Sequence, residues 1–344
     1  MTFRAGLIGY GLGGKTFHAP LLEAAGIDLV AIASSRESDI KADFPEATPH
    51  ANADALLTDN SLDLVIVCTP SQTHSDVTIK ALDAGHNVVV DKPFAATAGD
   101  ADRMIAAAAN SGKLLSCFQN RRWDSDFLTI KDLLARDTLG QVHEYQANFE
   151  FYKPDPGDVW QNRDLPAVGI EYDLGTHMID QTVQLFGVPE WVEGDLRKMR
   201  PVSQVHDLMT VRFGYGGMRA TMTASYLSTN HTLRSTIHGA TGSFRKYHMD
   251  CQEAQLKGGM KATDPAFGVE DPSKYGTLTQ FTDGALQDEA LPLKNGEHHT
   301  YYRLVREAIQ AGTPPPVTAE EARTVIGLIE TAQEASKRGT RIHL

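Results

Sequence analysis

Short apolar runs alternate with segments of helical periodicity over the first third of the chain. Runs such as Leu64-Val65-Ile66-Val67 are apolar at every position, which is typical of parallel strands that helices cover on both faces. The alanine-rich segment at residues 101–109 has the composition of a crossover helix between such strands. We therefore predict a doubly wound α/β domain over residues 1–121. Its expected strands lie at residues 3–8, 29–33, 64–68, 87–90 and 114–118.

The pattern changes after residue 121. A helical period predicts an amphipathic helix at residues 125–135, and a long strand-like run follows at residues 142–152. Further alternating or β-branched runs, separated by glycine-rich turns, predict a mostly antiparallel sheet at residues 208–213, 219–226 and 235–238. Three prolines at positions 314–316 separate two final helices, expected at residues 299–310 and 319–337. Residues 122–344 are therefore expected to form a second, α+β domain.

Length and composition agree with two folded domains. The chain has 344 residues, and a domain takes about 100 to 200. Hydrophobic residues make up 41% and charged residues 22%, far from the composition of disordered chains. No apolar run approaches the roughly 18 to 20 residues that span a bilayer, and residues 1–14 lack the features of a signal peptide. We expect a cytoplasmic protein without a membrane partner.

The charge balance narrows the range of partners. The formal net charge is −12, from 32 basic and 44 acidic residues, and neither half of the chain forms a basic pole. Nucleic acid and anionic membranes are therefore disfavoured as partners. Cys68, Cys117 and Cys251 are odd in number and widely spaced, so they form neither a disulfide framework nor a zinc pattern. We interpret them as inert buried thiols and predict no metal site.

A glycine-rich loop follows the first expected strand. It reads Gly9-Tyr10-Gly11-Leu12-Gly13-Gly14 and contains the spacing G-x-G-x-x-G. In dinucleotide-binding folds the first glycine allows a tight turn, the second lets a pyrophosphate approach, and the third brings the helix against the strand. A purely structural turn is the alternative. Because the loop opens a helix at the start of a βαβ unit, we predict that it binds a nicotinamide dinucleotide.

The segment after the second strand bears on the choice of cofactor. About 20 residues beyond the glycines, where NAD enzymes carry an acidic residue for the ribose 2′-hydroxyl, the chain has Ser34, Ser35 and Arg36. Two hydroxyls and a guanidinium suit a 2′-phosphate, so NADP is favoured. The alternative is an ordinary loop in which Glu37 takes part in binding NAD.

Two polar motifs follow later strands of the first domain. Thr69-Pro70 and His74 come after one strand, and Asp91-Lys92 comes after the next. In open α/β sheets ligands bind outside the carboxyl ends of the strands, so Lys92 is placed where chemistry is expected. An ordinary surface lysine at a strand exit is the alternative.

A further group of polar residues lies in the second domain. Asp173, His177 and Asp180 are spaced so that all three share one face of a helix. A carboxylate beside an imidazole can orient it and favour its protonated form. The alternative is a solvated polar face. The segment has neither a His-Glu-x-x-His motif nor a Cys/His cluster, which argues against a metal.

Six short motifs in one order connect these observations, and together they resemble the Gfo/Idh/MocA oxidoreductase family over essentially the whole chain. The motifs are Gly9-x-Gly11-x-x-Gly14, Thr69-Pro70-Ser71-x-x-His74, Ala81-Leu82-x-Ala84-Gly85, Asp91-Lys92-Pro93, Asn120-Arg121-Arg122-Trp123 and Asp173-Leu174-Gly175-x-His177-x-x-Asp180. Within the family, Lys15-Thr16-Phe17-His18-Ala19-Pro20 and Ser243-Phe244-x-Lys246-Tyr247 resemble the branch of NADP-dependent scyllo-inositol dehydrogenases.

The resemblance implies an N-terminal Rossmann domain and a C-terminal α+β domain with a large, mostly antiparallel open sheet, with the catalytic cleft between them. It also implies a homodimer or homotetramer formed through that sheet. The family's catalytic residues correspond to Lys92, Asp173 and His177, and substrate contacts are expected from the same three residues and from Arg122, Trp160 and Arg163. The chain departs from the family where Asp91 replaces the commoner Glu, and where Gln161 follows Trp160 in place of Arg.

The expected reaction is the reversible oxidation of a secondary alcohol on a sugar or cyclitol, with NADP as cofactor and NAD as the alternative. His177 would act as general base, Lys92 would stabilise charge on the reacting oxygen, and Asp173 would orient His177 or the substrate. Two other functions compete with this one. They are a cofactor-binding regulator without turnover and an NAD-dependent glycosidase. Secreted relatives of the glucose-fructose oxidoreductase type are disfavoured, because the sequence shows no twin-arginine leader.

Overall fold

The computed structural model describes residues 2–157, 159–230 and 232–344, and the chain divides into two compact units. The first comprises residues 1–120, 252–267 and 297–326, and the second comprises residues 121–251, 268–296 and 327–344. The first break lies next to the predicted boundary at residue 121. The two later segments of the first unit were not predicted from the sequence, which suggested a single switch from one domain to the other.

The first unit is built on a parallel sheet whose described strands have the order β3-β2-β1-β4-β5-β6, which confirms the predicted doubly wound fold. All residues of β4, β5 and β6 are buried, as expected for strands that helices cover on both faces. The strands are β1 (Phe3–Ile8), β2 (Ile27–Ala33), β3 (Thr48–His50), β4 (Leu64–Val67), β5 (Val88–Val90) and β6 (Leu115–Cys117). The order reverses between β1 and β4, and this is where ligands bind in such folds.

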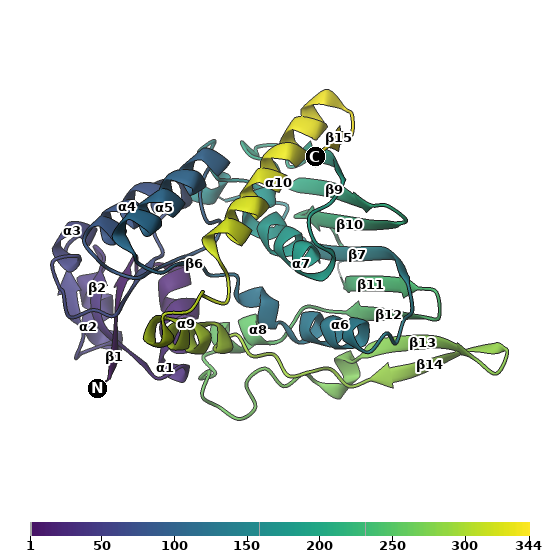
Figure 1. Ribbon diagram of the computed structural model, residues 1–344, viewed down its shortest axis with the longest axis horizontal. Helices are drawn as coiled ribbons and strands as arrows, with labels where there is room; N and C mark the ends of the chain where they lie inside the picture. The colour runs from purple at the N-terminus through teal and green to yellow at the C-terminus, as the bar shows by residue number, and fades with distance from the viewer. Residues whose placement is uncertain (1, 158, 231) are drawn as a thin grey trace. The chain divides into compact units, whose positions relative to one another are not determined.

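Helices connect these strands in the first unit (Figure 1). A π-helical turn, η1 (Gly13–His18), leads into α1 (Ala19–Ala24), and α4 (His74–Asp83) packs against α5 (Ala98–Ser111). From later in the chain, α9 (Thr300–Ala311) adds two buried tyrosines. This unit also contains α2 (Glu37–Asp43), α3 (Ala53–Leu56), η2 (Ser71–Thr73), α8 (Gln252–Lys257) and residues 319–326 of α10 (Ala319–Arg338).

The second unit contains a large sheet with the strand order β14-β13-β12-β11-β7-β10-β9-β8-β15 among the described residues. Of the described strand pairs in this sheet, β7 and β10 are the one parallel pair, so the predicted mostly antiparallel sheet is confirmed. The strands are β7 (Val142–Glu150), β8 (Trp191–Arg197), β9 (Leu208–Tyr215), β10 (Met218–Ser225), β11 (Leu233–Gly239), β12 (Gly242–Tyr247), β13 (Gly276–Thr282), β14 (Ala285–Leu291) and β15 (Ile342–His343).

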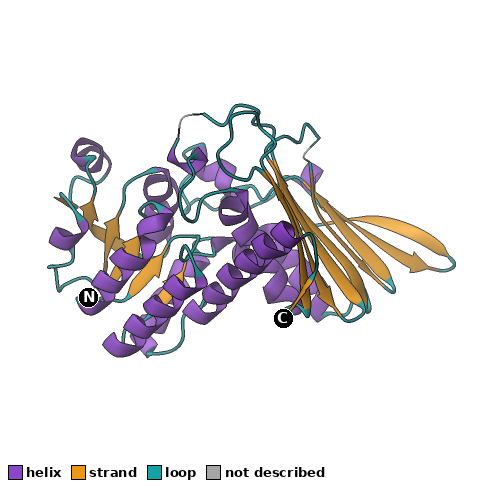
Figure 2. Ribbon diagram, turned by 90° about the horizontal axis from the view of Figure 1, so that it is seen from above, coloured by secondary structure: helices purple, strands orange, loops and turns teal. Residues whose placement is uncertain are grey.

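One face of this sheet is covered by helices. In β7, Tyr145, Ala147 and Phe149 are buried, whereas the residues between them are partly exposed, as alternation along a half-covered strand requires. The covering helices are α6 (Ser125–Ala135), α7 (Thr176–Phe186) and residues 327–338 of α10 (Ala319–Arg338). In the part of the chain that the structure describes, no helix lies on the opposite face (Figure 2). The expected homo-oligomer through this sheet stays a prediction.

The covered face of the sheet also holds charged side chains. The Arg234 guanidinium lies 3.3 Å from the Asp126 carboxylate, and the Lys246 ammonium lies 3.7 Å from Glu270. All four side chains are buried. Burial raises the pKa values of Asp126 and Glu270 and lowers that of Lys246, while the partner charges oppose these shifts.

None of the described helices is long and apolar enough to cross a bilayer.

The same substitution at two positions of this sheet should separate core packing from surface effects. Phe213 in β9 is 0% exposed, whereas Phe281 in β13 is 66% exposed. We expect Phe213→Ala to lower the free energy of unfolding by about 3 to 5 kcal/mol, because it leaves a cavity in the core. Phe281→Ala should change it by less than about 0.5 kcal/mol. Urea unfolding of both variants tests this, and equal losses would contradict the assignment of the covered face.

Candidate active site

The predicted cofactor loop begins with a turn that only glycine tolerates. Gly9 has φ +105°, and its N–H donates to the Ala33 carbonyl at 2.9 Å. A Cβ atom at this position would lie 2.2 Å from the Cys68 carbonyl oxygen. Any side chain would therefore push apart the ends of β1 and β4. This is the tight turn expected of the first glycine in the motif.

The rest of the loop has the geometry that a dinucleotide requires. A Cβ atom at Gly14 would lie 2.3 Å from the Gly9 carbonyl oxygen, so the helix comes as close to the strand as predicted. At Gly11, by contrast, the described residues place nothing within 4 Å of a Cβ atom. The loop is therefore open on the side where a pyrophosphate approaches, and a helix starts directly after it. These features fit a bound nicotinamide dinucleotide.

Tyr10 and Leu12 of the same loop differ in their surroundings. Leu12 is exposed, whereas Tyr10 is buried and its hydroxyl donates to Asp43 at 2.7 Å. Burial, and then the Asp43 carboxylate, raise the pKa of Tyr10. The Lys15 ammonium lies 2.6 Å from the same carboxylate. Asp43 thus binds both Tyr10 and Lys15, and the buried Tyr10 side chain attaches the loop to α2.

The segment after β2 presents the predicted 2′-phosphate residues. Ser35 and Arg36 are exposed, and the Ser34 hydroxyl accepts a hydrogen bond from the Arg36 N–H at 3.3 Å. The Ser34 N–H donates to the His50 carbonyl at 3.1 Å, which fixes the start of the segment. Glu37, the residue on which the NAD alternative depends, forms an ion pair with Lys41 at 2.5 Å.

His74 links the two later loops of the first unit. It is buried, and its ring nitrogens contact the carbonyl oxygens of Pro93 and Thr69 at 2.8 and 2.9 Å. The Thr69 and Thr73 hydroxyls are 2.8 Å apart, which closes the turn before α4. Burial lowers the pKa of His74. The imidazole therefore holds the loop after β4 against the loop after β5, and a direct contact between His74 and a cofactor stays a prediction.

Asp91 and Lys92 directly follow β5. The Asp91 carboxylate accepts the Lys92 N–H at 2.8 Å and the Cys68 thiol at 3.3 Å. Burial would raise the pKa of Asp91, but the nearby His18 and the charge of Lys92 hold it well below its usual value. Lys92 is partly buried. Asp91 and Lys92 follow the carboxyl end of β5, where the sequence placed them, and their roles toward cofactor and substrate stay predictions.

In the second unit, Arg122 is bound to a residue of α7. Its guanidinium donates to both carboxylate oxygens of Asp180, at 2.9 and 2.7 Å, and both side chains are buried. The Gln181 side chain donates to the Arg121 carbonyl at 2.7 Å. These bonds fasten α7 to the segment at residues 121–123. The predicted contact of Arg122 with substrate stays a prediction.

Asp173 lies in the turn directly before α7 and His177 lies in the first turn of α7, and their geometry differs from the one expected. Residues Glu171–Gly175 form a π-helical turn, η5, so the segment does not keep a regular α-helical register. Asp173 is exposed, whereas His177 is 5% and Asp180 is 2% exposed. The alternative of a solvated polar face is therefore wrong, because two of the three residues are buried. The Asp173 carboxylate accepts the Tyr226 hydroxyl at 2.7 Å.

Glu171 is a buried residue of this segment that the sequence interpretation missed. Its carboxylate contacts the His206 ring at 2.7 Å and accepts the Gln333 amide at 3.0 Å. The contact with Glu171 raises the pKa of His206. Because its partners come from residues far along the chain, no local spacing could have identified Glu171. It fixes the turn that precedes Asp173.

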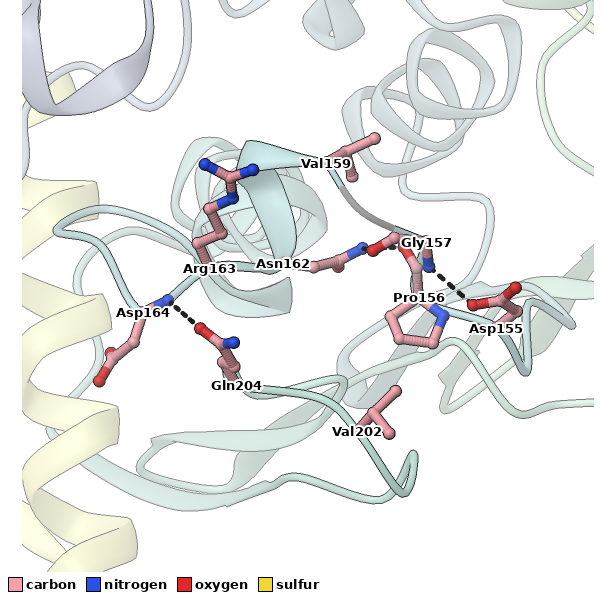
Figure 3. Close-up of a pocket in the computed structure, with 9 residues that line it drawn as sticks. All are labelled: Asp155, Pro156, Gly157, Val159, Asn162, Arg163, Asp164, Val202 and Gln204. Atoms are coloured by element: carbon pink, nitrogen blue, oxygen red, sulfur yellow. Dashed lines mark hydrogen bonds between the residues drawn. The ribbon is translucent and has the colours of Figure 1, made fainter.

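Arg163 lines a cavity of about 490 Å³ in the second unit (Figure 3). Trp160 begins the short helix η4 (Trp160–Asn162). In this cavity wall the Asp164 N–H donates to the Gln204 side chain at 3.2 Å, and the Asn162 amide donates to the Gly157 carbonyl at 3.2 Å. Both polar and apolar residues line the cavity. The roles of Trp160 and Arg163 in binding substrate stay predictions.

Comparisons with known proteins cover both units. The family described as "Oxidoreductase family, NAD-binding Rossmann fold" matches residues 3–119, and the one described as "Oxidoreductase family, C-terminal alpha/beta domain" matches residues 131–344. The chain is 38% identical to the scyllo-inositol 2-dehydrogenase (NADP(+)) IolW of Bacillus subtilis, over 100% of this chain and 96% of that protein. It is also 38% identical to the oxidoreductase YdgJ of Escherichia coli, over 97% and 96% of the two chains.

Solved structures show the same architecture. The oxidoreductase YvaA of Bacillus subtilis matches with a TM-score of 0.96 at 38% identity, and the match covers 100% of this chain and 99% of that one. This agreement extends over both units and includes the Rossmann sheet that carries the glycine loop. The chain therefore belongs to the Gfo/Idh/MocA family of oxidoreductases, which act on CH–OH groups with NAD(P).

Proposed function

We propose that this protein is an NADP-dependent dehydrogenase that interconverts a secondary alcohol and a ketone on a sugar or cyclitol. Scyllo-inositol is the first substrate to test. The observation that carries the proposal is the full-length similarity to an NADP-dependent scyllo-inositol 2-dehydrogenase, combined with Lys92 at the end of a strand next to the cofactor loop. The net charge of −12 agrees with a small neutral substrate better than with a polyanion.

In the proposed reaction, Lys92 donates a hydrogen bond to the reacting oxygen and stabilises the negative charge that develops there. The position of Lys92 is fixed through its backbone, because its N–H is bound by Asp91. Asp91 in turn is held by the Cys68 thiol. The bound nicotinamide supplies the hydride acceptor for the alcohol carbon.

His177 takes the proton of the substrate hydroxyl as general base, a role that suits an imidazole near neutral pH. The hydroxyl proton thereby passes to His177, and with a nicotinamide bound to take the hydride the product would be a ketone. Asp173 accepts the Tyr226 hydroxyl with one oxygen, so its carboxylate is fixed in direction and can orient a substrate hydroxyl. The Arg122–Asp180 ion pair holds the helix that carries His177.

The preference for NADP rests on the segment after β2. Ser35 and Arg36 are exposed there, and no carboxylate occupies positions 34 to 36 to repel a 2′-phosphate. Glu37 follows, but its side chain is paired with Lys41. A guanidinium with hydroxyl neighbours is well suited to a phosphate monoester.

A substrate panel tests the proposal directly. Inositols, aldoses and ketoses should each be assayed with NADP and with NAD by following the absorbance of the reduced cofactor. We expect turnover of at least one cyclitol or sugar with NADP. Tight cofactor binding without turnover on a broad panel would instead support a regulator, and hydrolysis without net cofactor reduction would support a glycosidase.

Replacing Lys92 or His177 should remove most of the hydride transfer. We expect Lys92→Ala to lower turnover by about 10² or more, because charge on the reacting oxygen loses its stabilisation. His177→Ala should lower it by about 10² to 10⁴ through loss of the general base. Steady-state kinetics measures both effects, with Lys80→Ala and His343→Ala as exposed controls. Unchanged turnover in both active-site variants would refute the assignment.

Replacing Arg36 should change the choice of cofactor. A hydrogen bond to a charged group contributes about 1.5 to 3 kcal/mol, so Arg36→Ala should raise KM for NADP by roughly tenfold or more. KM for NAD should change less than about twofold, since NAD has no 2′-phosphate. Arg103→Ala, an arginine that α5 exposes in the same unit, serves as the control. An equal change with both cofactors would show that Arg36 does not contact the 2′-phosphate.

A further inference from the structure

Three side chains with metal-binding atoms converge at the carboxyl edge of the first unit's sheet. They are His18 at the end of η1, Cys68 directly after β4, and Asp91 directly after β5. The ring nitrogen, the sulfur and a carboxylate oxygen all lie within 4.8 Å of one another. The Cys68 sulfur is 3.3 Å from Asp91 Oδ2, and His18 Nε2 is 3.6 Å from Asp91 Oδ1.

These separations suit a cation with tetrahedral coordination. Zn²⁺ binds imidazole nitrogen, thiolate sulfur and carboxylate oxygen at about 2.0 to 2.3 Å, so ligand atoms around it lie roughly 3.3 to 3.8 Å apart. The Cys68 sulfur and His18 Nε2 lie at distances of this order from Asp91, each from a different carboxylate oxygen, so a small rotation of the carboxylate directs one oxygen to a shared cation. Three protein ligands leave a fourth position for water or another ligand.

The surroundings of His18 direct one ring nitrogen to this cluster. Its Nδ1 lies 2.5 Å from the Tyr302 hydroxyl, and its ring packs against Phe118 with centroids 4.3 Å apart. Its Nε2 is buried, lies opposite Asp91, and has no hydrogen-bond partner among the described residues. Metal-binding histidines commonly bond an oxygen through the other ring nitrogen, which fixes the ring and the tautomer. Tyr302 occupies that outer position here.

Binding of a cation to this cluster displaces one proton. The Cys68 thiol donates a hydrogen bond to Asp91 Oδ2 at 3.3 Å. When a divalent cation binds, the thiol releases this proton to solvent and the thiolate becomes a ligand beside the imidazole and the carboxylate.

We propose that His18, Cys68 and Asp91 form a binding site for one thiophilic divalent cation, for which Zn²⁺ is the probe. The site lies against the cofactor loop, because a Cβ atom at Gly13 would lie 2.8 Å from the Cys68 sulfur and 3.2 Å from Asp91 Oδ2. One of its ligands, Asp91, also directly precedes Lys92 in the chain. A bound cation therefore inhibits the dehydrogenase reversibly, a consequence that rests on the proposed function.

The test of binding needs neither cofactor nor substrate. Tag-free protein, stripped with a chelator, is titrated with Zn²⁺ in competition with a chromophoric chelator, and with Co²⁺ for its absorption spectrum. We expect one equivalent per chain and a thiolate-to-cobalt charge-transfer band. Cys68→Ser should abolish that band, and Tyr302→Phe should weaken the affinity by about 10- to 100-fold through loss of the outer bond. Cys251→Ser, which changes a cysteine of the other unit, should leave both unchanged.

Three results would overturn the site: no stoichiometric binding to the unmodified chain, a cobalt spectrum without a thiolate band, or an affinity that Cys68→Ser does not change. The first two need no variant, so a misfolded variant cannot decide them. Inhibition is assayed separately, with one equivalent of Zn²⁺ and reversal by chelator. Binding without inhibition would overturn the inhibitory consequence, whereas an inactive enzyme that still binds Zn²⁺ would count against the proposed function alone.

Discussion

The close approach of the turns after β1 and β4 is the constraint on which the first unit's site depends. A Cβ atom at Gly9 would lie 2.2 Å from the Cys68 carbonyl oxygen, and the Cys68 N–H donates to the Ile8 carbonyl at 2.8 Å. Because the two strand ends are held at this distance, the glycine loop lies directly over Cys68 and Asp91. His74 then ties the turn after β4 to the turn after β5. The contact at Gly9, together with the bonds of His74, thus brings the loops after β1, β4 and β5 close together.

The sequence predicted five of the six described strands of this unit because most of their residues are apolar and buried, and it missed β3, which has no buried residue. Residues 3–8 were expected as a strand and form β1, and the other four runs differ from their strands by one or two residues at an end. The hairpin of β13 and β14 was missed, because β14 is almost fully exposed and its sequence lacks the apolar alternation of a strand. Residues 252–267 and 297–326 also belong to the first unit, and no local sequence pattern indicates this.

For the site, the sequence could place residues on elements but could not supply their partners. Lys92 and the glycine loop follow from strand ends, which are local features. The bonds between Arg122 and Asp180 join residues 58 positions apart, and only the folded chain reveals them. The helical spacing of Asp173 and His177 assumed an α-helical pitch, and the π-helical turn at Glu171–Gly175 changes that register. Cys68 was interpreted as inert from the number and spacing of the cysteines alone, whereas its neighbours His18 and Asp91 are 50 and 23 positions away along the chain.

The helix that carries His177 is positioned by directional bonds as well as by the apolar packing of Met178 and Ile179. Asp180 accepts Arg122, Gln181 accepts Arg234 at 2.9 Å, and the same glutamine donates to the Arg121 carbonyl. Buried ion pairs contribute little net stability, because desolvation offsets the attraction, but removing one partner leaves an uncompensated charge. An apolar helix face could rotate or slide by a fraction of a turn at small cost, whereas a bidentate pair fixes both rotation and register. The role of general base that we propose for His177 requires that kind of positioning, since proton transfer requires an approach within hydrogen-bonding distance.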